Sequence, residues 1–295
     1  MNFDGHLFFS GAAAPTPRIA PRRRTFAGHR PAAALSVLGG EVFIGWLLAQ
    51  AGLDATAYRA QPLLRRVPAL LRALRVETAG EARQRLEDAP ELLSAALDIV
   101  LLGVTTFNRD REVFNLLRDH VLPELLARPG RLRIWSAACS DGSEAYSVGM
   151  QLAELGGLAR AELVGSDCRP GAIVRASAGV FAPEALASLA PGGAAYFVPV
   201  GNRRVQVCAG LRGAVRWRVV NLLEKVLPGP WDIILCRNVA IYLQPETAAE
   251  VWRRLVRELR PGGFLITGKA DNPPRELRLE RVARCVYQLP QYDRA

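Results

Sequence analysis

The sequence predicts an α/β protein with a small all-helical domain in front of its sheet. Two observations carry this prediction: apolar residues recur at helical spacing from about residue 40, and short apolar strands alternate with helices after about residue 130. Strands that alternate with helices are typical of a parallel sheet covered on both faces. We therefore expect a disordered Ala/Pro/Arg-rich tail (1–34), a helical domain (35–103), a linker helix (104–130) and an α/β domain (131–295) with a small antiparallel β-subdomain inserted at about 194–220.

The helical domain is expected to contain several short helices. In one segment, one face is apolar and another face is basic. The apolar residues are Leu63, Val67, Leu70, Leu71 and Leu74, and the basic ones are Arg65, Arg72 and Arg75. Pro62 suits a helix start, whereas Pro68 is expected to break or kink the segment. Further helices are predicted at Ala79–Asp88 and Pro90–Leu102.

The α/β domain is expected to contain four main strands with helices between them. The strands are predicted at Leu132–Ala137, Ala161–Ser166, Trp231–Cys236 and Gly263–Thr267. Helices are expected at Ala145–Leu155 and Pro245–Leu259. The short alternating runs Val205–Val207 and Val215–Trp217 are interpreted as antiparallel strands of the inserted subdomain.

Charge and cysteine content limit the function classes. The chain has 38 basic and 28 acidic residues, a formal balance of +10, and only Lys225 and Lys269 are lysines. An arginine surplus suits docking on acidic partners, although a GC-rich genome would also produce it. The five cysteines are widely spaced without a CxxC pair, which argues against a zinc site and fits a reducing cytoplasm. No apolar run reaches the ~18 residues of a membrane span.

Polar residues follow three of the predicted strands. The first strand runs into a turn of small residues, Ala137–Glu144, the second ends at Asp167, and the third ends at Arg237 and Asn238. Open α/β sheets bind ligands at the carboxyl ends of their strands, and an acid there can hold a ribose diol. The turn is neither a phosphate P-loop nor a GxGxxG dinucleotide turn. Each feature alone also fits a solvated loop, and their succession favours a nucleoside cofactor.

Four stretches, in this order and spacing, make the chain similar to a known family. They are Thr105–Asp110, Trp135–Ser147, Asn221–Leu223 and Cys236–Tyr242. Through them the chain resembles the CheR-type chemotaxis receptor glutamate O-methyltransferases. The resemblance covers roughly residues 41–270.

The resemblance implies a fold and an activity. The implied fold is a Rossmann-like methyltransferase domain with an inserted antiparallel subdomain, preceded by a helical domain. The implied activity is cytoplasmic methyl transfer from S-adenosyl-L-methionine to glutamate side chains of a methyl-accepting chemotaxis receptor, which is a helical bundle. A glutamate carboxylate is already ionised at neutral pH, so this chemistry requires no strong general base. No metal and no membrane insertion are expected.

The resemblance also implies roles for nine residues. Those expected at the cofactor are Thr105, Arg109, Glu144, Asp167, Asn221, Leu222, Arg237 and Asn238. Among them, Glu144 is implied at the methionyl end, Asp167 at the ribose, and Asn221 with Leu222 at the adenine edge. The expected catalytic residues are Arg109, Tyr242 and Arg237. Arg109 would face the methionyl or the acceptor carboxylate, while Asn238 and Tyr242 would line the transfer site.

The chain departs from the family pattern near this site. In the linker, which usually reads Asn-Val-Thr and continues Phe-Phe-Arg, Gly103 replaces the asparagine and Asn108 the second phenylalanine. The turn commonly reads Ser-Thr-Gly-Glu-Glu-Pro in the family, and here Asp141, Ser143 and Ala145 differ. The last strand commonly ends Gly-His-Ser-Glu, and here the histidine, serine and glutamate are replaced by Lys269, Ala270 and Asp271. These changes leave two alternatives open: a relative that binds cofactor but is catalytically impaired, or a methyltransferase of another substrate such as RNA. No aromatic-basic interleaving or RNA-reading motif is present, so nucleic acid is the weaker expectation.

Overall fold

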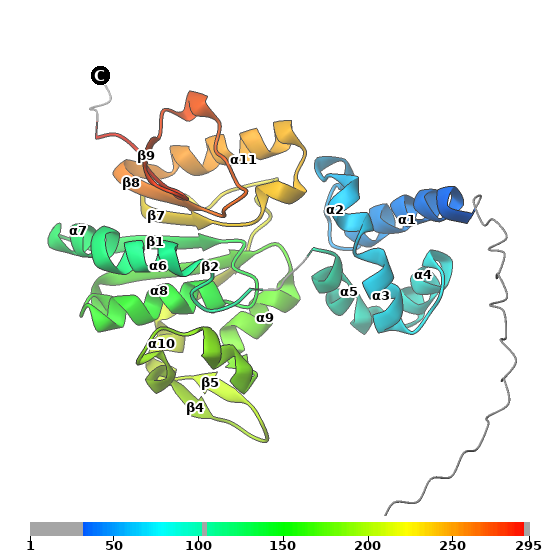
Figure 1. Cartoon of the computed structure of the whole chain (residues 1–295), viewed down its shortest axis with the longest axis horizontal. Coiled ribbons are helices and arrows are strands. Elements are labelled where there is room, and N and C mark those ends of the chain that lie inside the picture. Colours follow the sequence, from blue (N-terminus) through cyan, green and yellow to red (C-terminus); the bar gives the residue numbers. More distant parts are fainter. Residues whose placement is uncertain (1–31, 102–104, 292–295) are drawn as a thin grey trace, which may run out of the picture.

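The computed structural model describes residues 32–101 and 105–291 (Figure 1). Most of the expected tail, residues 1–31, lies outside the described residues, as does the replaced Gly103. The end predicted for the tail was wrong, because a helix already begins at Ala32.

The N-terminal part is helical, as predicted. Its helices are α1 (Ala32–Ala49), α2 (Ala60–Leu64), α3 (Val67–Leu74), α4 (Ala79–Asp88) and α5 (Leu93–Val100). The segment around Pro68 is split into α2 and α3, since proline has no N–H to continue a helix and sits in the first turn of α3. The α4 helix has the predicted bounds, and a capping box between Thr78 and Glu81 fixes its start. In place of one helix at Pro90–Leu102, a 3-10 turn (Pro90–Leu92) precedes α5.

A broken helix connects these helices to the sheet. It consists of α6 (Arg111–Leu116), a π turn (Leu117–Val121) and α7 (Leu122–Ala127). The predicted linker helix is therefore present but interrupted. Its buried residues Phe114, Leu117 and Val121 pack on the sheet's first helix and strand.

The central sheet is the predicted α/β sheet, with three strands more than the four that were expected. Its strands are β1 (Leu132–Ala137), β2 (Ala161–Asp167), β6 (Val215–Val219), β7 (Trp231–Cys236), β8 (Leu259–Thr267), β9 (Glu280–Ala283) and β10 (Val286–Gln288). Their order is β6-β2-β1-β7-β8-β10-β9, and all neighbours are parallel except β10, which pairs antiparallel with β8 and β9. The chain runs outward from β1 to β6 and then returns to add β7 beside β1. This reversal puts a ligand-binding crevice at the carboxyl ends of β1 and β7.

Helices cover both faces of the sheet. They are α8 (Ser143–Glu154), α9 (Pro170–Ala178), α10 (Ala209–Ala214) and α11 (Pro245–Arg257). Alternate residues of β1 enter two separate cores: Trp135 packs with α11 and the N-terminal helices, whereas Ile134 packs with α6, α7 and α8. Part of the larger core is thus shared between the N-terminal helices and the sheet.

The inserted subdomain differs from the prediction. Its sheet consists of β3 (Val180–Phe181), β4 (Phe197–Pro199) and β5 (Val205–Val207), and β5 is antiparallel to both neighbours. Val215–Trp217 was wrongly predicted as part of it. That run belongs to β6, which pairs parallel with β2 at the edge of the central sheet. An edge strand has polar residues on its exposed face, so its alternating pattern looks like that of a small antiparallel sheet.

The N-terminal helices contact the sheet domain at two places that bear on the site. Tyr58 forms an antiparallel bridge with Leu243, and the backbone N–H of Gln244 donates to the Ala57 carbonyl at 2.8 Å. On the other side α5 packs against α9 (Figure 1). The residues that follow β7 are therefore held by backbone pairing from the helical domain.

Candidate functional site

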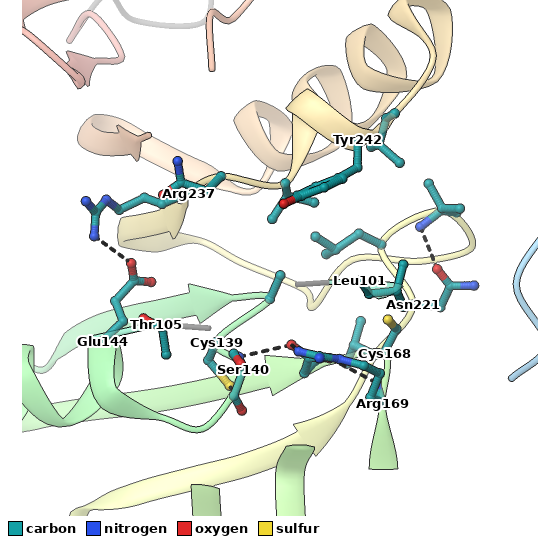
Figure 2. Close-up of a pocket in the computed structure, with 18 of the residues that line it drawn as sticks. Leu101, Thr105, Cys139, Ser140, Glu144, Cys168, Arg169, Asn221, Arg237 and Tyr242 are labelled. Atoms are coloured by element: carbon teal, nitrogen blue, oxygen red, sulfur yellow. Dashed lines mark hydrogen bonds and ion pairs between the residues drawn. The ribbon is translucent and has the colours of Figure 1, made fainter. Parts of the chain in front are cut away.

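A pocket of about 950 Å³, open solvent at its mouth included, lies at the carboxyl ends of β1, β2 and β7 (Figure 2). All nine side chains expected at the site line it. They are Thr105, Arg109, Glu144, Asp167, Asn221, Leu222, Arg237, Asn238 and Tyr242. Residues more than 130 positions apart in the sequence thus meet in one cavity.

Four further residues that line the pocket were not predicted from the sequence. Tyr58 and Leu101 come from the N-terminal helices, and Cys168 and Arg169 follow β2. Arg169 lies two residues after Asp167, so its position could have been noticed. Tyr58 had no sequence signal, because only the docking of the helical domain brings it to the pocket.

The turn after β1 has an unusual backbone. Ala138, Ser140 and Gly142 all have positive φ values, and the two non-glycine residues carry that cost only because the surrounding fold holds them. At Gly142, with φ +86°, a Cβ atom would lie 2.6 Å from the Trp217 ring. The glycine therefore lets the turn lie close to Trp217 of β6 and Ala176 of α9.

A buried ion network joins the linker to the third strand end. The Nη1 atom of Arg237 lies 3.1 Å from Glu144 Oε2 (Figure 2). Its Nη2 atom lies 2.6 Å from Asp110 Oδ2. Asp110 also pairs with Lys269 at 3.1 Å. Because Arg237 is only 7% exposed and already faces two carboxylates, it orients this end of the pocket. Glu144 accepts one further bond, from Ser136, which leaves about two of its roughly four acceptor positions open.

Asp167 is engaged far more fully. Its Oδ1 atom accepts from the Arg169 amide at 3.0 Å and from Arg169 Nε at 2.9 Å. Its Oδ2 atom accepts from the Ser140 amide at 3.0 Å and from Arg169 Nη2 at 3.1 Å. Asp167 is 3% exposed. The carboxylate is therefore held by four protein donors.

Asn238 and Asp271 fix the loop after β7. The Asp271 Oδ2 atom accepts from the backbone N–H groups of Asn238 and Gly268. Burial raises the pKa of Asp271 above its ordinary value, although these backbone donors oppose the shift. Asp271 replaces a glutamate of the family pattern and keeps a carboxylate next to Asn238, which lines the pocket.

Tyr242 and Arg109 lie near each other at the pocket. Burial raises the pKa of Tyr242, and the positive charges of Arg66 and Arg109 act in the opposite direction. Arg109 itself is exposed. This edge of the pocket therefore combines a half-buried phenol with an accessible guanidinium.

Several departures from the family pattern are accommodated locally. Asp141 Oδ1 accepts from both the amide and the hydroxyl of Ser143, so these two replacements bond to each other. Asn108 adopts φ +49°, which asparagine tolerates better than most residues. Its backbone N–H donates to the Ser147 hydroxyl at 3.0 Å. The replaced residues in the turn and in the linker therefore form hydrogen bonds that hold their own local backbone.

The pocket fits S-adenosylmethionine chemically. Val220, Leu222 and Leu101 supply apolar contacts for a flat base, and Glu144 has open acceptor positions for an ammonium group. Arg109 supplies a cation for a carboxylate. Within the described ranges, no group of three or more His, Cys, Asp or Glu side chains could hold a metal ion. No helix in the same ranges has the length and apolarity needed to span a membrane.

Comparisons with known proteins agree with this geometry. The family model described as "CheR methyltransferase, SAM binding domain" matches residues 103–286. The chain is 30% identical over 222 residues to a chemotaxis protein methyltransferase of Listeria monocytogenes, covering 75% of this chain and 84% of that one. It is 35% identical over 208 residues to chemotaxis protein methyltransferase 1 of Pseudomonas aeruginosa, covering 66% and 76%. The chain therefore belongs to the CheR methyltransferase family, and its pocket lies in the S-adenosylmethionine-binding domain of that family.

Proposed function

We propose that this methyltransferase transfers the methyl group of S-adenosylmethionine to glutamate side chains of chemotaxis receptors in the cytoplasm. The convergence of all nine expected side chains on one pocket is the observation that carries the proposal. The names of the relatives, which are chemotaxis methyltransferases, support the substrate class.

Each residue of the pocket has a proposed role that follows from its chemistry. Glu144 would hold the methionyl ammonium, Asn221 and Leu222 the adenine edge, and Thr105 would cover the cofactor from the linker. Arg237 and Asn238 would shape the transfer site through the contacts described above. When bound, the cofactor supplies a methyl group on a sulfonium.

The acceptor carboxylate needs alignment more than activation. It is ionised at neutral pH, and positioning two reactants can lower a barrier by several kcal/mol. Arg109 is exposed at the pocket beside Tyr242, so it can pair with an incoming glutamate. Tyr242 would pack or hydrogen-bond beside the same carboxylate, which withdraws it from bulk water.

We further propose that the helical part, residues 35–103, is a domain that faces the receptor. The exposed arginines of its α2–α3 region, Arg65, Arg72 and Arg75, pair with no carboxylate among the described residues. They are thus available for acidic side chains on a helical bundle.

Methanol release tests the proposal directly. Purified protein is incubated with methyl-labelled S-adenosylmethionine and cytoplasmic receptor fragments, and the product is treated with base. Labelled methanol is expected, since carboxyl methyl esters hydrolyse in base whereas methylated nitrogen does not. Cofactor binding without any ester on the receptors of the same operon would favour a catalytically impaired relative, and label in RNA would favour the other alternative.

A further inference from the structure

The acid at the end of β2 has no acceptor position left for a ligand. A carboxylate offers about four lone-pair positions. The four donors to Asp167 described above, three of them from Arg169 and one from Ser140, use that number. A ribose hydroxyl would therefore find no open position on Asp167 in this arrangement.

Arg169, unlike Asp167, has hydrogen-bonding positions that the protein does not use. Its guanidinium carries five N–H hydrogens, and three of them are used: two toward Asp167 and one toward Asp98. The side chain lines the pocket yet is only 5% exposed. Two charged donors thus remain at the place where an acceptor was expected (Figure 2).

The second anchor of Arg169 comes from the N-terminal helices. Asp98 lies on α5, accepts from Arg169 Nη1 at 2.8 Å and also pairs with Arg175 of α9. The two helices are closely packed there, since a Cβ on Gly171 would lie 2.0 Å from the Ser94 hydroxyl. Asp98 itself does not line the pocket. Any effect of Asp98 on a ligand would therefore pass through Arg169.

We propose that Arg169 binds the ribose hydroxyls of the cofactor, with Asp167 and Asp98 as the positioning residues that hold its guanidinium. Hydroxyl oxygens accept hydrogen bonds readily, and bonds from a charged donor are the stronger kind. The contact links cofactor binding to the docking of the helical domain. The inference rests on the proposed function in one respect: the pocket must take S-adenosylmethionine.

Calorimetry with S-adenosyl-L-homocysteine tests the contact. Arg169→Ala is expected to weaken binding at least about tenfold, the range for a lost hydrogen bond to a charged group. The same substitution should have little effect on an analogue that lacks both ribose hydroxyls. Equal weakening for both ligands would place the contact elsewhere, and unchanged or tighter binding of S-adenosyl-L-homocysteine would show that Arg169 only covers Asp167. If Arg169→Ala does not fold, Arg169→Gln is tested in its place with the same expectation in direction.

Asp98→Asn tests the anchor, and Glu162→Gln is its matched control. Both carboxylates are about one-fifth exposed, at 22% and 20%, and each pairs with two arginines, but Glu162 lies at the opposite end of β2. Asp98→Asn is expected to weaken the binding of S-adenosyl-L-homocysteine about three- to tenfold, which is a typical size of energetic coupling between sites. Glu162→Gln is expected to weaken it less than about twofold. Similar weakening by both variants would show a general loss of stability.

A double-mutant cycle separates positioning from stability. In the Arg169→Ala background, Asp98→Asn is expected to have no further effect on affinity, because the residue it acts through is gone. The same loss in both backgrounds would leave Asp98 as a structural residue only. The wild type is the reference for the proposed function: if it binds no S-adenosyl-L-homocysteine, that function fails. If it binds and the Arg169 variants bind equally well, only this inference fails.

Discussion

Glu144 at the start of α8 and Arg237 after β7 form a buried ion pair, 3.1 Å between Oε2 and Nη1, although 92 residues separate them in the chain. Arg237 also faces Asp110, so one guanidinium neutralises two carboxylates. Removing it would leave Glu144 without a charged partner in a poorly solvated place and leave Asp110 paired with Lys269 alone. The pair therefore serves both the fold and the pocket.

Arg237→Met is expected to lower the free energy of unfolding by about 3–5 kcal/mol, the cost of leaving buried charge without its partner. Arg128→Met is the control, because Arg128 pairs with the exposed Glu124 and such pairs contribute about 0–1 kcal/mol. Urea unfolding measures both. Equal losses for the two variants would contradict a special role for the buried network.

Asp271→Asn is expected to change the pH dependence of stability. Burial raises the pKa of Asp271 in the folded state, so the folded protein holds this proton to higher pH than the unfolded chain does. Ionisation of Asp271 therefore costs stability as the pH rises from the unfolded pKa upward. The asparagine cannot ionise and keeps an oxygen acceptor for the Asn238 and Gly268 amides. Urea unfolding between pH 3.5 and 7 should show the variant gaining on the wild type as the pH rises; a constant difference would contradict the shift.

Asp167→Ala is expected to weaken S-adenosyl-L-homocysteine binding by about 1–3 kcal/mol, since it removes the carboxylate that holds Arg169 and the Ser140 amide. Calorimetry gives the affinity, and circular dichroism shows whether the variant folds. Unchanged affinity in a folded variant would remove Asp167 from the site.

Triple replacement of Arg65, Arg72 and Arg75 by glutamate is expected to impair receptor methylation much more than cofactor binding. The three side chains are exposed on the helical part, and opposite charges there would repel an acidic receptor surface. Arg66 is left unchanged because its charge acts on Tyr242. The wild-type reaction should also weaken with added salt. Equal losses in methylation and cofactor binding would indicate misfolding, and no loss would exclude this surface.

Local sequence patterns were enough to predict most of the central sheet. The apolar runs at β1 and β7 were found with their observed bounds, because strands buried on both faces read as continuous apolar segments. The run at β6 was assigned to the wrong sheet because its edge position makes it alternate. Pairing partners are long-range facts that a local pattern does not contain.

The site was predictable where side chains sit at strand ends and where the family resemblance named them. Tyr58 and Arg169 were missed for different reasons. Tyr58 reaches the pocket only because its backbone pairs with Leu243, nearly 200 residues away. Arg169 is visible in the sequence, but its importance follows from bonds to Asp167 and Asp98 that only the folded chain shows.

Arg109→Ala is expected to reduce methyl transfer at least about 100-fold, consistent with loss of a positioned charged contact. An interaction made mainly with the aligned acceptor should appear in turnover and leave cofactor affinity nearly unchanged. Tyr242→Phe should have a smaller effect, because the ring that packs beside the acceptor remains. A parallel loss of cofactor affinity in Arg109→Ala would assign Arg109 to the methionyl carboxylate.

The effects of Arg109→Ala and Tyr242→Phe can be measured only if the wild-type protein transfers methyl groups. If the protein binds cofactor but methylates none of the receptors of its own operon, alignment at the pocket has been lost and the replaced residues become the targets. Lys269 is the first of them, since it pairs with Asp110, which in turn holds Arg237. Lys269→His restores the residue of the family pattern and removes that pair at neutral pH, because an imidazole with an ordinary pKa is mostly uncharged there. Recovered methanol release would show an intact scaffold whose acceptor site was misaligned, and no recovery in the Lys269→His, Asn108→Phe double variant would place the defect elsewhere.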